Sequence, residues 1–335
     1  MAIDVGLATL SNNLLYSAMV VYTGAMVCYA AELAFGNRRA RRVSAAEPEL
    51  VTVGAAAPTA SVATTVEPAG SSYDESEPDR SLRSRGDRMG RIGVSLTVLA
   101  FLLHAGAVVA RGVAAGRMPW GNMFEFSTAG ALAVTGVYLV LLARKPVRYL
   151  GLFVVGPVLL VLGLAVTVLY TEAEQLVPAL KSVWLGIHVT AAIVAMGLFT
   201  VGFSQTILYL IQARRERVPE AERSRNFMDH FPTAAALDRA AYRMHAFVFP
   251  LWTFAIMAGA IWAENAWGRY WGWDPKEVWS FITWVAYAAY LHARATAGWR
   301  GHKAAYVALA AYGTILFNYL VVNIWLVGFH SYSGV

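Results

Sequence analysis

The stretch WGRYWGWDPKEVWS, residues 267–280, combines indole rings with ionisable side chains at short spacing. Trp267, Trp271 and Trp273 are separated by glycines and charged or polar residues. Because indole rings offer large, flat apolar faces, this spacing favours a platform for a flat apolar ligand. Tryptophan is also enriched where membrane helices meet water, so a simple interfacial belt is an equally good interpretation. A belt accounts well for the more scattered tryptophans, which are Trp120, Trp184, Trp252 and Trp325.

The end of this stretch has the residues that start a helix. Asp274 is a favourable N-cap, Pro275 suits the first helical position, and Glu277 follows the cap by three residues, as in a capping box. The tryptophans are therefore expected in a loop that leads into a helix. We expect Asp274 and Glu277 to cap this helix rather than to react.

Histidines are the second group of residues that could do chemistry. His188 follows Trp184 closely, and His330 follows the last apolar run of the chain. Two imidazoles that meet on one face can serve as the two axial ligands of one haem iron. The alternatives are a packing role for His188 and a polar tail position for His330. A zinc site is less favoured, because no thiolates or clustered carboxylates accompany these histidines.

Composition shows which elements must position these residues. The chain has 335 residues, of which 58% are hydrophobic and 14% are charged, and its mean hydropathy is +0.49. Soluble domains carry about a quarter of charged residues, so this is the composition of a membrane protein. Runs of about 20 apolar residues can cross a bilayer as helices. We predict an all-α, polytopic membrane protein with about eight transmembrane helices, near 14–35, 92–112, 124–143, 150–170, 184–212, 245–263, 275–293 and 304–327.

Three regions are predicted along the chain. Residues 1–36 contain an N-terminal transmembrane helix, which we expect to be retained because no basic segment precedes it. Residues 37–91 are rich in Ala, Ser, Pro, Glu and Arg, and are predicted to be a cytoplasmic, disordered, low-complexity loop. Residues 92–335 form the main membrane domain, with the tryptophan-rich motif at 267–274.

The basic residues predict the orientation in the membrane. Most of the 27 Lys and Arg fall in alternate loops, which the positive-inside rule places in the cytoplasm. Both termini and the tryptophan motif are then extracytoplasmic, in an integral plasma membrane protein. Because the bases lie between apolar runs, the net charge of +6 does not indicate nucleic acid as a partner. The exceptions to the pattern are Arg111, Arg117, Lys181, Arg269 and Lys276.

This topology sorts the remaining histidines by depth. His188 and His330 fall on the outer side with the motif. His292 follows Pro275 by seventeen residues, which places it roughly 25 Å along its helix and in the inner half of the membrane. His104 lies in the middle of a span, and His245 at the cytoplasmic start of another, where it is expected to reach the interface.

Several motifs resemble a known family. WGRYWGWD matches the WGxxWxWD signature of haem-handling proteins of cytochrome c maturation, called the WWD motif. Its continuation, PKEVWSFITWVAYAAYLHAR, resembles the CcsA/ResC family of System II, whose members are sometimes called CcsB. LVPALKSVWLGIHV and GFHSYSG resemble the segments that carry its two external histidines, here His188 and His330. GRMPWGNMFEFS resembles its G-x-x-P-x-x-N-x-(Y/F)-E element, with Gly116, Pro119, Asn122 and Glu125.

The resemblance, which covers about 92–335, implies a function. Family members move haem b and present it on the outer face, where a cytochrome c synthase joins it by thioether bonds to the CxxCH motif of apocytochrome c. The implied partners are a ResB/CcsB-type membrane subunit, apocytochrome c, thiol-reducing proteins of the pathway and membrane lipids. In this interpretation His188 and His330 are the axial ligands of the haem iron, and His292 belongs to a transmembrane haem site shared with the partner subunit. The haem cradle would consist of Trp267, Gly268, Trp271, Gly272, Trp273 and Asp274.

Other functions stay open at this point. A haem transporter or exporter would deliver haem without catalysing its attachment, and discontinuous helices would favour it; Gly156 and Pro157 are the weak hints of one. A sibling WWD protein of another maturation system and a purely structural subunit are further alternatives. Arg269 and Lys276 flank the motif, and they either neutralise haem propionates or anchor the loop at the interface.

Overall fold

The fold is all-α, as predicted. The computed structural model describes residues 3–36, 77–174, 182–223, 226–296 and 299–330, and among these residues it contains helices and no strand. The helices that cross or could cross a membrane are α1 (Val5–Gly36), α3 (Glu77–Ala115), α4 (Met123–Arg144), α5 (Gly151–Thr167), α6 (Val183–Glu216), α7 (Ala234–Trp267), α8 (Pro275–Ala295) and α9 (His302–Phe317).

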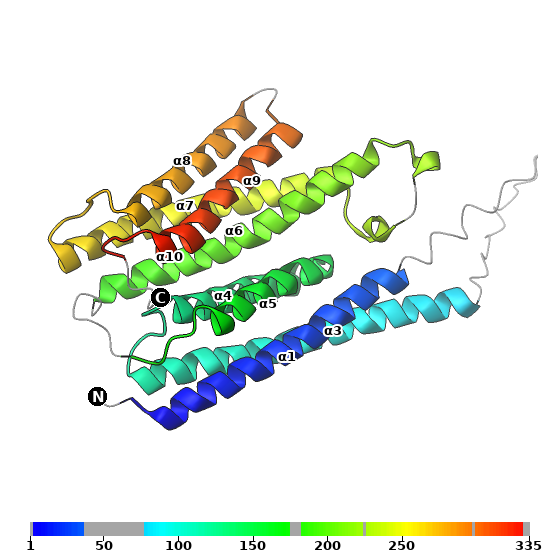
Figure 1. The fold of residues 1–335 in the computed structure, drawn as a ribbon. Coiled ribbons are helices and arrows are strands. Elements are labelled where there is room, and N and C mark those ends of the chain that lie inside the picture. The colour runs from blue at the N-terminus through cyan, green and yellow to red at the C-terminus, as the bar shows by residue number, and fades with distance from the viewer. Residues whose placement is uncertain (1–2, 37–76, 175–181, 224–225, 297–298, 331–335) are drawn as a thin grey trace, which may run out of the picture.

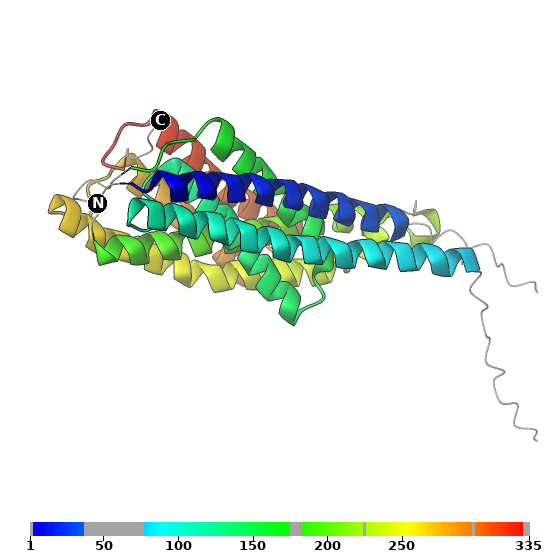
Figure 2. The ribbon, with the colours of Figure 1, turned by 90° about the horizontal axis from the view of Figure 1, so that it is seen from below.

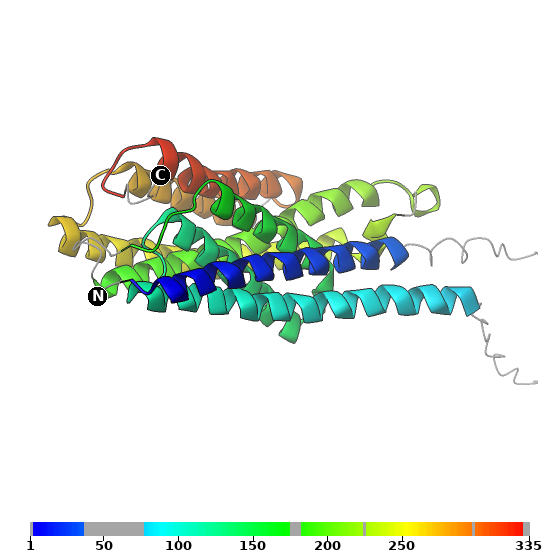
Figure 3. The same ribbon diagram turned by 60° about the horizontal axis from the view of Figure 1, so that its bottom comes forward.

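The helices are arranged as neighbouring pairs. In Figure 1, α1 runs beside α3, α4 beside α5, α6 beside α7, and α8 beside α9. Figures 2 and 3 show that the start of α1, the 268–274 loop and the segment after α10 (Asn323–Trp325) lie at the same end of the bundle. This end is called the motif end below. The opposite end, where α8 stops and α9 begins, is called the basic end.

All eight predicted spans are helical. Seven of the described helices are long and apolar enough to cross a membrane. The eighth, α8, has 21 residues, which at 1.5 Å per residue also reach across a hydrocarbon core of about 30 Å. It is less apolar because Lys276 and Glu277 lie in its first turn and His292 and Arg294 in its last. The prediction of a polytopic helical membrane protein is therefore confirmed.

Two helices begin earlier than the sequence predicted. α3 starts at Glu77 rather than near residue 92, so residues 77–91 are helical and do not belong to the expected loop 37–91. Hydropathy detects only the apolar part of a helix, and this extension is charged. It lies along α1, where Arg148 forms ion pairs with Glu32 and Asp87, both at 2.6 Å. Residues 37–76 of the predicted loop lie outside the described residues, and α7 likewise starts at Ala234 rather than near 245.

The last predicted span is interrupted. α9 is followed by a five-residue π-helical turn, Asn318–Val322, and then by the short helix α10. The Asn323 side chain donates hydrogen bonds to the carbonyls of Tyr319, at 2.8 Å, and Asn318, at 3.3 Å, which the widened turn exposes. Such turns are rare and are frequent at functional sites. By contrast, α5 runs through Pro157 without a break, so the suggested discontinuity there is absent.

Candidate functional site

The tryptophan motif is a loop held at both of its ends. Gly268 ends α7 in the left-handed conformation, with φ of +70°, and its N–H donates to the Glu264 carbonyl at 2.9 Å. At the other end the predicted capping box is present. The Lys276 N–H donates to Asp274 Oδ1 at 3.1 Å, and the Asp274 N–H donates to Glu277 Oε2 at 3.0 Å. The start of α8 is thus confirmed as the sequence predicted it.

Glycine and glutamate shape the middle of the loop. The Gly272 N–H donates to the same Glu277 oxygen at 2.8 Å, so one carboxylate organises two loop amides. The Arg269 guanidinium lies against Gly272, in the space that a Cβ would occupy. Trp273 has a φ of +59°, in the left-handed region that non-glycine residues rarely adopt. Its side chain is 69% exposed.

Asp274 also binds the segment that follows α10. The Phe329 N–H donates to Asp274 Oδ2 at 2.6 Å, and Nδ1 of His330 lies 2.8 Å from Oδ1. Burial raises the pKa of Asp274, but the hydrogen bond from His330 and those from the backbone N–H groups of Lys276 and Phe329 outweigh it and hold the pKa below its ordinary value. Because a carboxylate only accepts, the His330 Nδ1 carries the proton and its Nε2 keeps a free lone pair.

His188 is held in the same way by a different acceptor. Its Nδ1 lies 2.7 Å from the carbonyl oxygen of Ala255, which also can only accept. The ring stacks on the Trp262 indole, with centroids 6.2 Å apart and planes inclined by 9°. Gly259 makes room for it, because a Cβ there would lie 2.7 Å from the imidazole. His188 therefore also presents an unprotonated Nε2.

The structure brings the two predicted ligands together. His330 also contacts Trp262, at 5.7 Å between ring centroids, so the two imidazoles flank the same indole. Both histidines line one cavity at the motif end. A histidine that binds a metal almost always donates its second N–H to a carbonyl or carboxylate, which fixes the tautomer. Both of these histidines have that arrangement.

The cavity is partly open to its surroundings and has a volume of about 170 Å³. Walls come from the α3–α4 connection and from α4, α6, α7, α8 and the π-helical turn, and most of the side chains are apolar. Polar groups are few, which is typical of small-molecule sites. They include Asn122, His188, Lys276, Glu277, Ser280, Asn318, Asn323 and His330.

The three motif tryptophans have different positions. Trp271 lines the cavity. Trp267 is not among the lining residues, and it packs behind them, against Trp262 at 4.7 Å and His330 at 4.9 Å. Trp273 contacts Trp271 edge-on, at 5.9 Å, and otherwise faces outward.

Other cavity tryptophans were assigned by sequence to an interfacial belt or to no role. Trp252 is buried and lines the cavity, and Trp120 lines it as well, so both have a position that the belt interpretation did not include. Trp262, which orders both histidines, was not singled out. Its position on α7, a few residues before the motif, is the signal that could have found it. Trp325 is 68% exposed, in agreement with the expected belt position.

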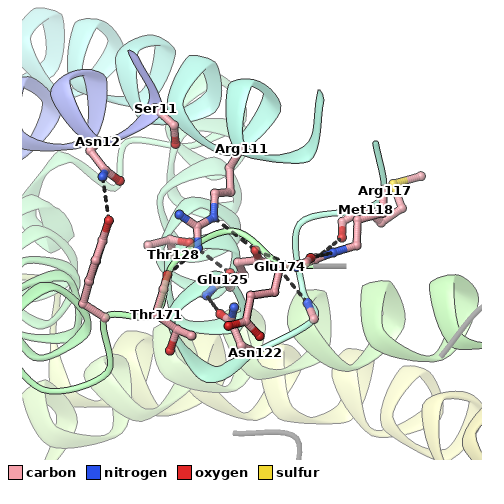
Figure 4. Close-up of polar contacts among 12 residues, drawn as sticks. Ser11, Asn12, Arg111, Arg117, Met118, Asn122, Glu125, Thr128, Thr171 and Glu174 are labelled. Carbon is pink, nitrogen blue, oxygen red and sulfur yellow. Dashed lines mark hydrogen bonds and ion pairs between the residues drawn. The ribbon is translucent and has the colours of Figure 1, made fainter. Parts of the chain in front are cut away.

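A second polar cluster holds the connection between α3 and α4 (Figure 4). Glu125, fully buried on α4, accepts from Arg111 Nε at 3.1 Å and from Arg117 Nη1 at 2.5 Å and Nη2 at 3.0 Å. The Gly121 N–H also donates to this carboxylate, at 2.8 Å, and Asn122 caps α4 by accepting from the Glu125 N–H at 2.9 Å. The cluster thereby fixes the turn 116–122, whose end lines the cavity.

The three other histidines that the sequence placed within spans lie away from the cavity. His292 is an exposed side chain near the basic end of α8. His104 is buried against Tyr22, edge-on at 6.0 Å. His245 is fully buried between Phe199 and Tyr290, well inside α7, and does not lie at a helix start as expected. The reason is the earlier start of α7, which moves position 245 into the bundle.

The fold and the cavity define a polytopic helical membrane protein with two histidines oriented for metal ligation. Within the described ranges, no three His, Cys, Asp or Glu residues form a metal-binding group. Axial ligation of a macrocycle-bound metal needs only two imidazoles.

Comparison with known proteins gives the family. A family model described as cytochrome c assembly protein matches residues 120–330. The cytochrome c biogenesis protein CcsA of Guillardia theta is 35% identical over 261 residues, which cover 72% of this chain and 85% of that protein. CcsA of Synechococcus sp. strain JA-3-3Ab is 34% identical, covering 76% and 88%. The chain belongs to this cytochrome c assembly family, in its CcsA/ResC branch, and the resemblance read from the motifs is confirmed.

A solved structure shows the same fold. The cytochrome c haem lyase CcmF superposes with a TM-score of 0.57 and 18% identity, over 96% of this chain and 47% of CcmF. This chain thus corresponds in fold to about half of that protein. Family membership gives the chain a role in cytochrome c biogenesis.

Proposed function

We propose that the cavity binds haem, with His188 and His330 as the two axial ligands of its iron. The orientation of the two imidazoles is the observation that carries this proposal. Each has its Nδ1–H engaged by an oxygen acceptor, each keeps Nε2 free, and both line a mostly apolar cavity. Trp271 and Trp262 supply flat apolar surface beside them, as a macrocycle requires.

The chain would present this haem for attachment to apocytochrome c. Thioether formation joins two thiols of a CxxCH segment to the haem vinyl groups, and a rigidly held haem contributes mainly orientation to that reaction. Bis-histidine ligation fills both axial positions of the iron. We infer that the chain acts as a System II synthase subunit with a ResB-type partner. Its motif end would face the outside of the cell membrane, since the basic loops lie at the other end.

Spectroscopy of the purified protein tests the binding site. Protein loaded with haem is expected to show a low-spin spectrum, which the His188→Ala, His330→Ala double variant should lose. His230→Ala is the matched control, because His230 is exposed at a distance from the cavity and should leave the spectrum unchanged. A low-spin spectrum that survives in the double variant would exclude these ligands.

Cell assays separate a synthase from a transporter. Holocytochrome c should accumulate when the chain is expressed with a ResB-type partner, and the double histidine variant should abolish this. If haem reached the outer face but no thioether bonds formed even with the partner, the chain would be a haem exporter.

His292 is proposed to belong to a separate transit site. It lies about 25 Å along α8 from the cavity end, too far to share an iron with His188 and His330. Its side chain is exposed, so a partner subunit can reach it. His292→Ala should lower the haem content while the remaining haem keeps its bis-histidine spectrum. If His292→Gln restores full loading, the histidine has only a hydrogen-bonding role.

A further inference from the structure

We propose that the ammonium group of Lys276 binds a carboxylate of the ligand in the cavity, and so fixes which edge of that ligand lies at the start of α8. The inference rests on the proposed function in one respect, namely that the ligand is haem, whose edge carries two propionate groups. Lys276 and Arg269 flank the motif alike in sequence, and the structure distinguishes them.

Lys276 lines the cavity and has no direct ion pair with a carboxylate of the described residues. Its Nζ donates to Oδ1 of Asn323 and lies 6.0 Å from the centre of the Phe126 ring. A lysine ammonium has three N–H donors, and Asn323 takes one of them. No carboxylate of the described residues lies within ion-pair distance of it. The remaining donors are therefore available to a ligand.

Asn323 holds the ammonium without neutralising it. Its side-chain nitrogen donates to the carbonyls of Tyr319 and Asn318, which the π-helical turn leaves accessible. This fixes the amide so that its oxygen faces Lys276. The acceptor is neutral, so it orients the cation and leaves its charge for the ligand.

The two nearby carboxylates accept from donors other than the Lys276 ammonium. Asp274 accepts from the N–H groups of Phe329 and Lys276 and from His330. Glu277 Oε2 accepts from two loop N–H groups, and Glu277 Oε1 is buried without a hydrogen-bond partner among the described residues. Both carboxylates lie at the N-terminus of α8, where the helix dipole stabilises negative charge. They organise the loop, and Lys276 remains the cation that faces the cavity.

Arg269 serves as the internal contrast. Its guanidinium lies over the Phe329 ring, 4.5 Å from the centroid, and Arg269 is not among the cavity-lining residues. It contacts the segment that carries His330, and its guanidinium is held over an aromatic ring rather than at the cavity wall. The sequence left two roles open for these bases. We assign the binding of a propionate to Lys276 and the anchoring of the loop to Arg269.

A carboxylate–ammonium hydrogen bond is strong in such a place. The cavity as a whole is mainly apolar, and charge-assisted hydrogen bonds gain strength where water is excluded. With its propionate edge at Lys276, haem would place its opposite, vinyl-bearing edge away from the start of α8. Lys276 is then a specificity-determining residue for anionic porphyrins.

Paired titrations with haem and haem dimethyl ester test the assignment, because the ester keeps the iron and the ring and removes both carboxylates. The wild-type protein is expected to bind haem at least about tenfold more tightly than the ester. In Lys276→Met the two affinities should become equal. Lys276→Arg should retain most of the preference, and Arg269→Met should retain all of it.

The outcomes distinguish this inference from the proposed function. If wild-type protein gives low-spin spectra with haem and ester at equal affinity, haem binding stands and the Lys276 assignment is overturned. The same holds if Lys276→Met keeps the preference for haem or if Arg269→Met removes it. If neither compound gives a low-spin spectrum, the proposed function fails and this inference fails with it.

Discussion

The motif end contains two polar clusters built from similar parts and used differently. One surrounds Glu125 in the α3–α4 connection, and the other surrounds Asp274 at the start of α8. Each centres on a buried carboxylate that accepts from side chains and from backbone N–H groups. Each also ties together segments that are distant in the sequence.

The two clusters differ in whether they leave polar groups available to a ligand. Glu125 accepts four hydrogen bonds, and the other donors of Arg111 and Arg117 reach backbone carbonyls of Thr171, Glu174 and Met118. The groups around Asp274 leave the Nε2 atom of His330 and the ammonium of Lys276 facing the cavity. A closed cluster maintains the shape of a wall, whereas an open one orients groups toward a ligand.

The largest expected effect comes from breaking the closed cluster. Glu125→Ala leaves two buried arginines without their counterion, which should cost about 3–5 kcal/mol of stability. Thermal unfolding of the purified protein in detergent measures the loss. Glu174→Ala is the control, since only its backbone carbonyl contacts Arg117, and it should change stability by less than about 0.5 kcal/mol. Equal stability of both variants would mean that the Glu125 cluster does not hold the wall.

The open cluster should affect the ligand more than the fold. Asp274→Asn keeps the shape of the side chain but weakens the hydrogen bond that orients His330. Changes in residues that orient a metal ligand typically cost 10–100-fold in affinity, and we expect a loss of haem affinity in this range. Glu264→Gln removes one charge near the same loop, where only its backbone contacts Gly268, and should leave the affinity unchanged. Unaltered haem binding in Asp274→Asn would contradict the role given to this carboxylate.

A smaller effect on haem affinity is expected from substituting two neighbouring tryptophans. Trp271 lines the cavity, whereas Trp273 is mostly exposed. Full burial of an aromatic side chain contributes up to about 3 kcal/mol, and Trp271 is only partly buried. A loss of about 1.4 kcal/mol, or roughly tenfold in haem affinity, is therefore expected for Trp271→Ala, and a much smaller loss for Trp273→Ala. Competition with apomyoglobin for bound haem measures both. Equal losses would show that the exposed indole contacts haem in a way that the isolated chain does not reveal.

The smallest effect is a pH dependence of stability. The folded-state pKa of Asp274 lies below its ordinary value of 3.8. Its stabilising contribution is therefore complete above the unfolded-state pKa near 4 and is lost as the pH falls through the lower folded-state value. The stability difference between wild type and Asp274→Asn should be constant from pH 5 to 7 and should shrink below about pH 4. A difference that changes between pH 5 and 7 would implicate another group.

Much of this architecture could be predicted from the sequence. Apolar runs gave all eight helices, because burial in a bilayer requires them, and the Asp274 capping box was predictable because its chemistry is local. Helix ends such as Glu77 and Ala234 were missed, since charged turns extend beyond the hydrocarbon and hydropathy does not detect them. The π-helical turn at Asn318 was also missed, because tertiary contacts of Asn323 stabilise it.

The candidate site was predictable to the extent that motifs carry it. His188 and His330 were identified from the motif resemblance, and the structure brings them to one cavity. Trp271 and Lys276 line the cavity, whereas Trp267, Trp273 and Arg269 do not. This difference depends on the direction of each side chain, which the spacing of residues does not show. Trp252 and Trp262 entered the site through the packing of α7 against α6, which spacing along the chain does not reveal.

The two proposed ligands differ in how much of the protein must move to separate them. His188 projects from α6, a helix of 34 residues packed along α7. His330 lies on the chain beyond α10, where the Asp274 carboxylate receives both its imidazole and the neighbouring Phe329 N–H. Releasing His330 therefore requires breaking its hydrogen bonds to Asp274 and the ring contacts of its segment, whereas releasing His188 requires shifting a transmembrane helix. A bound molecule would then leave from the His330 side, and the strength of the hydrogen bonds to Asp274 would influence its dissociation rate.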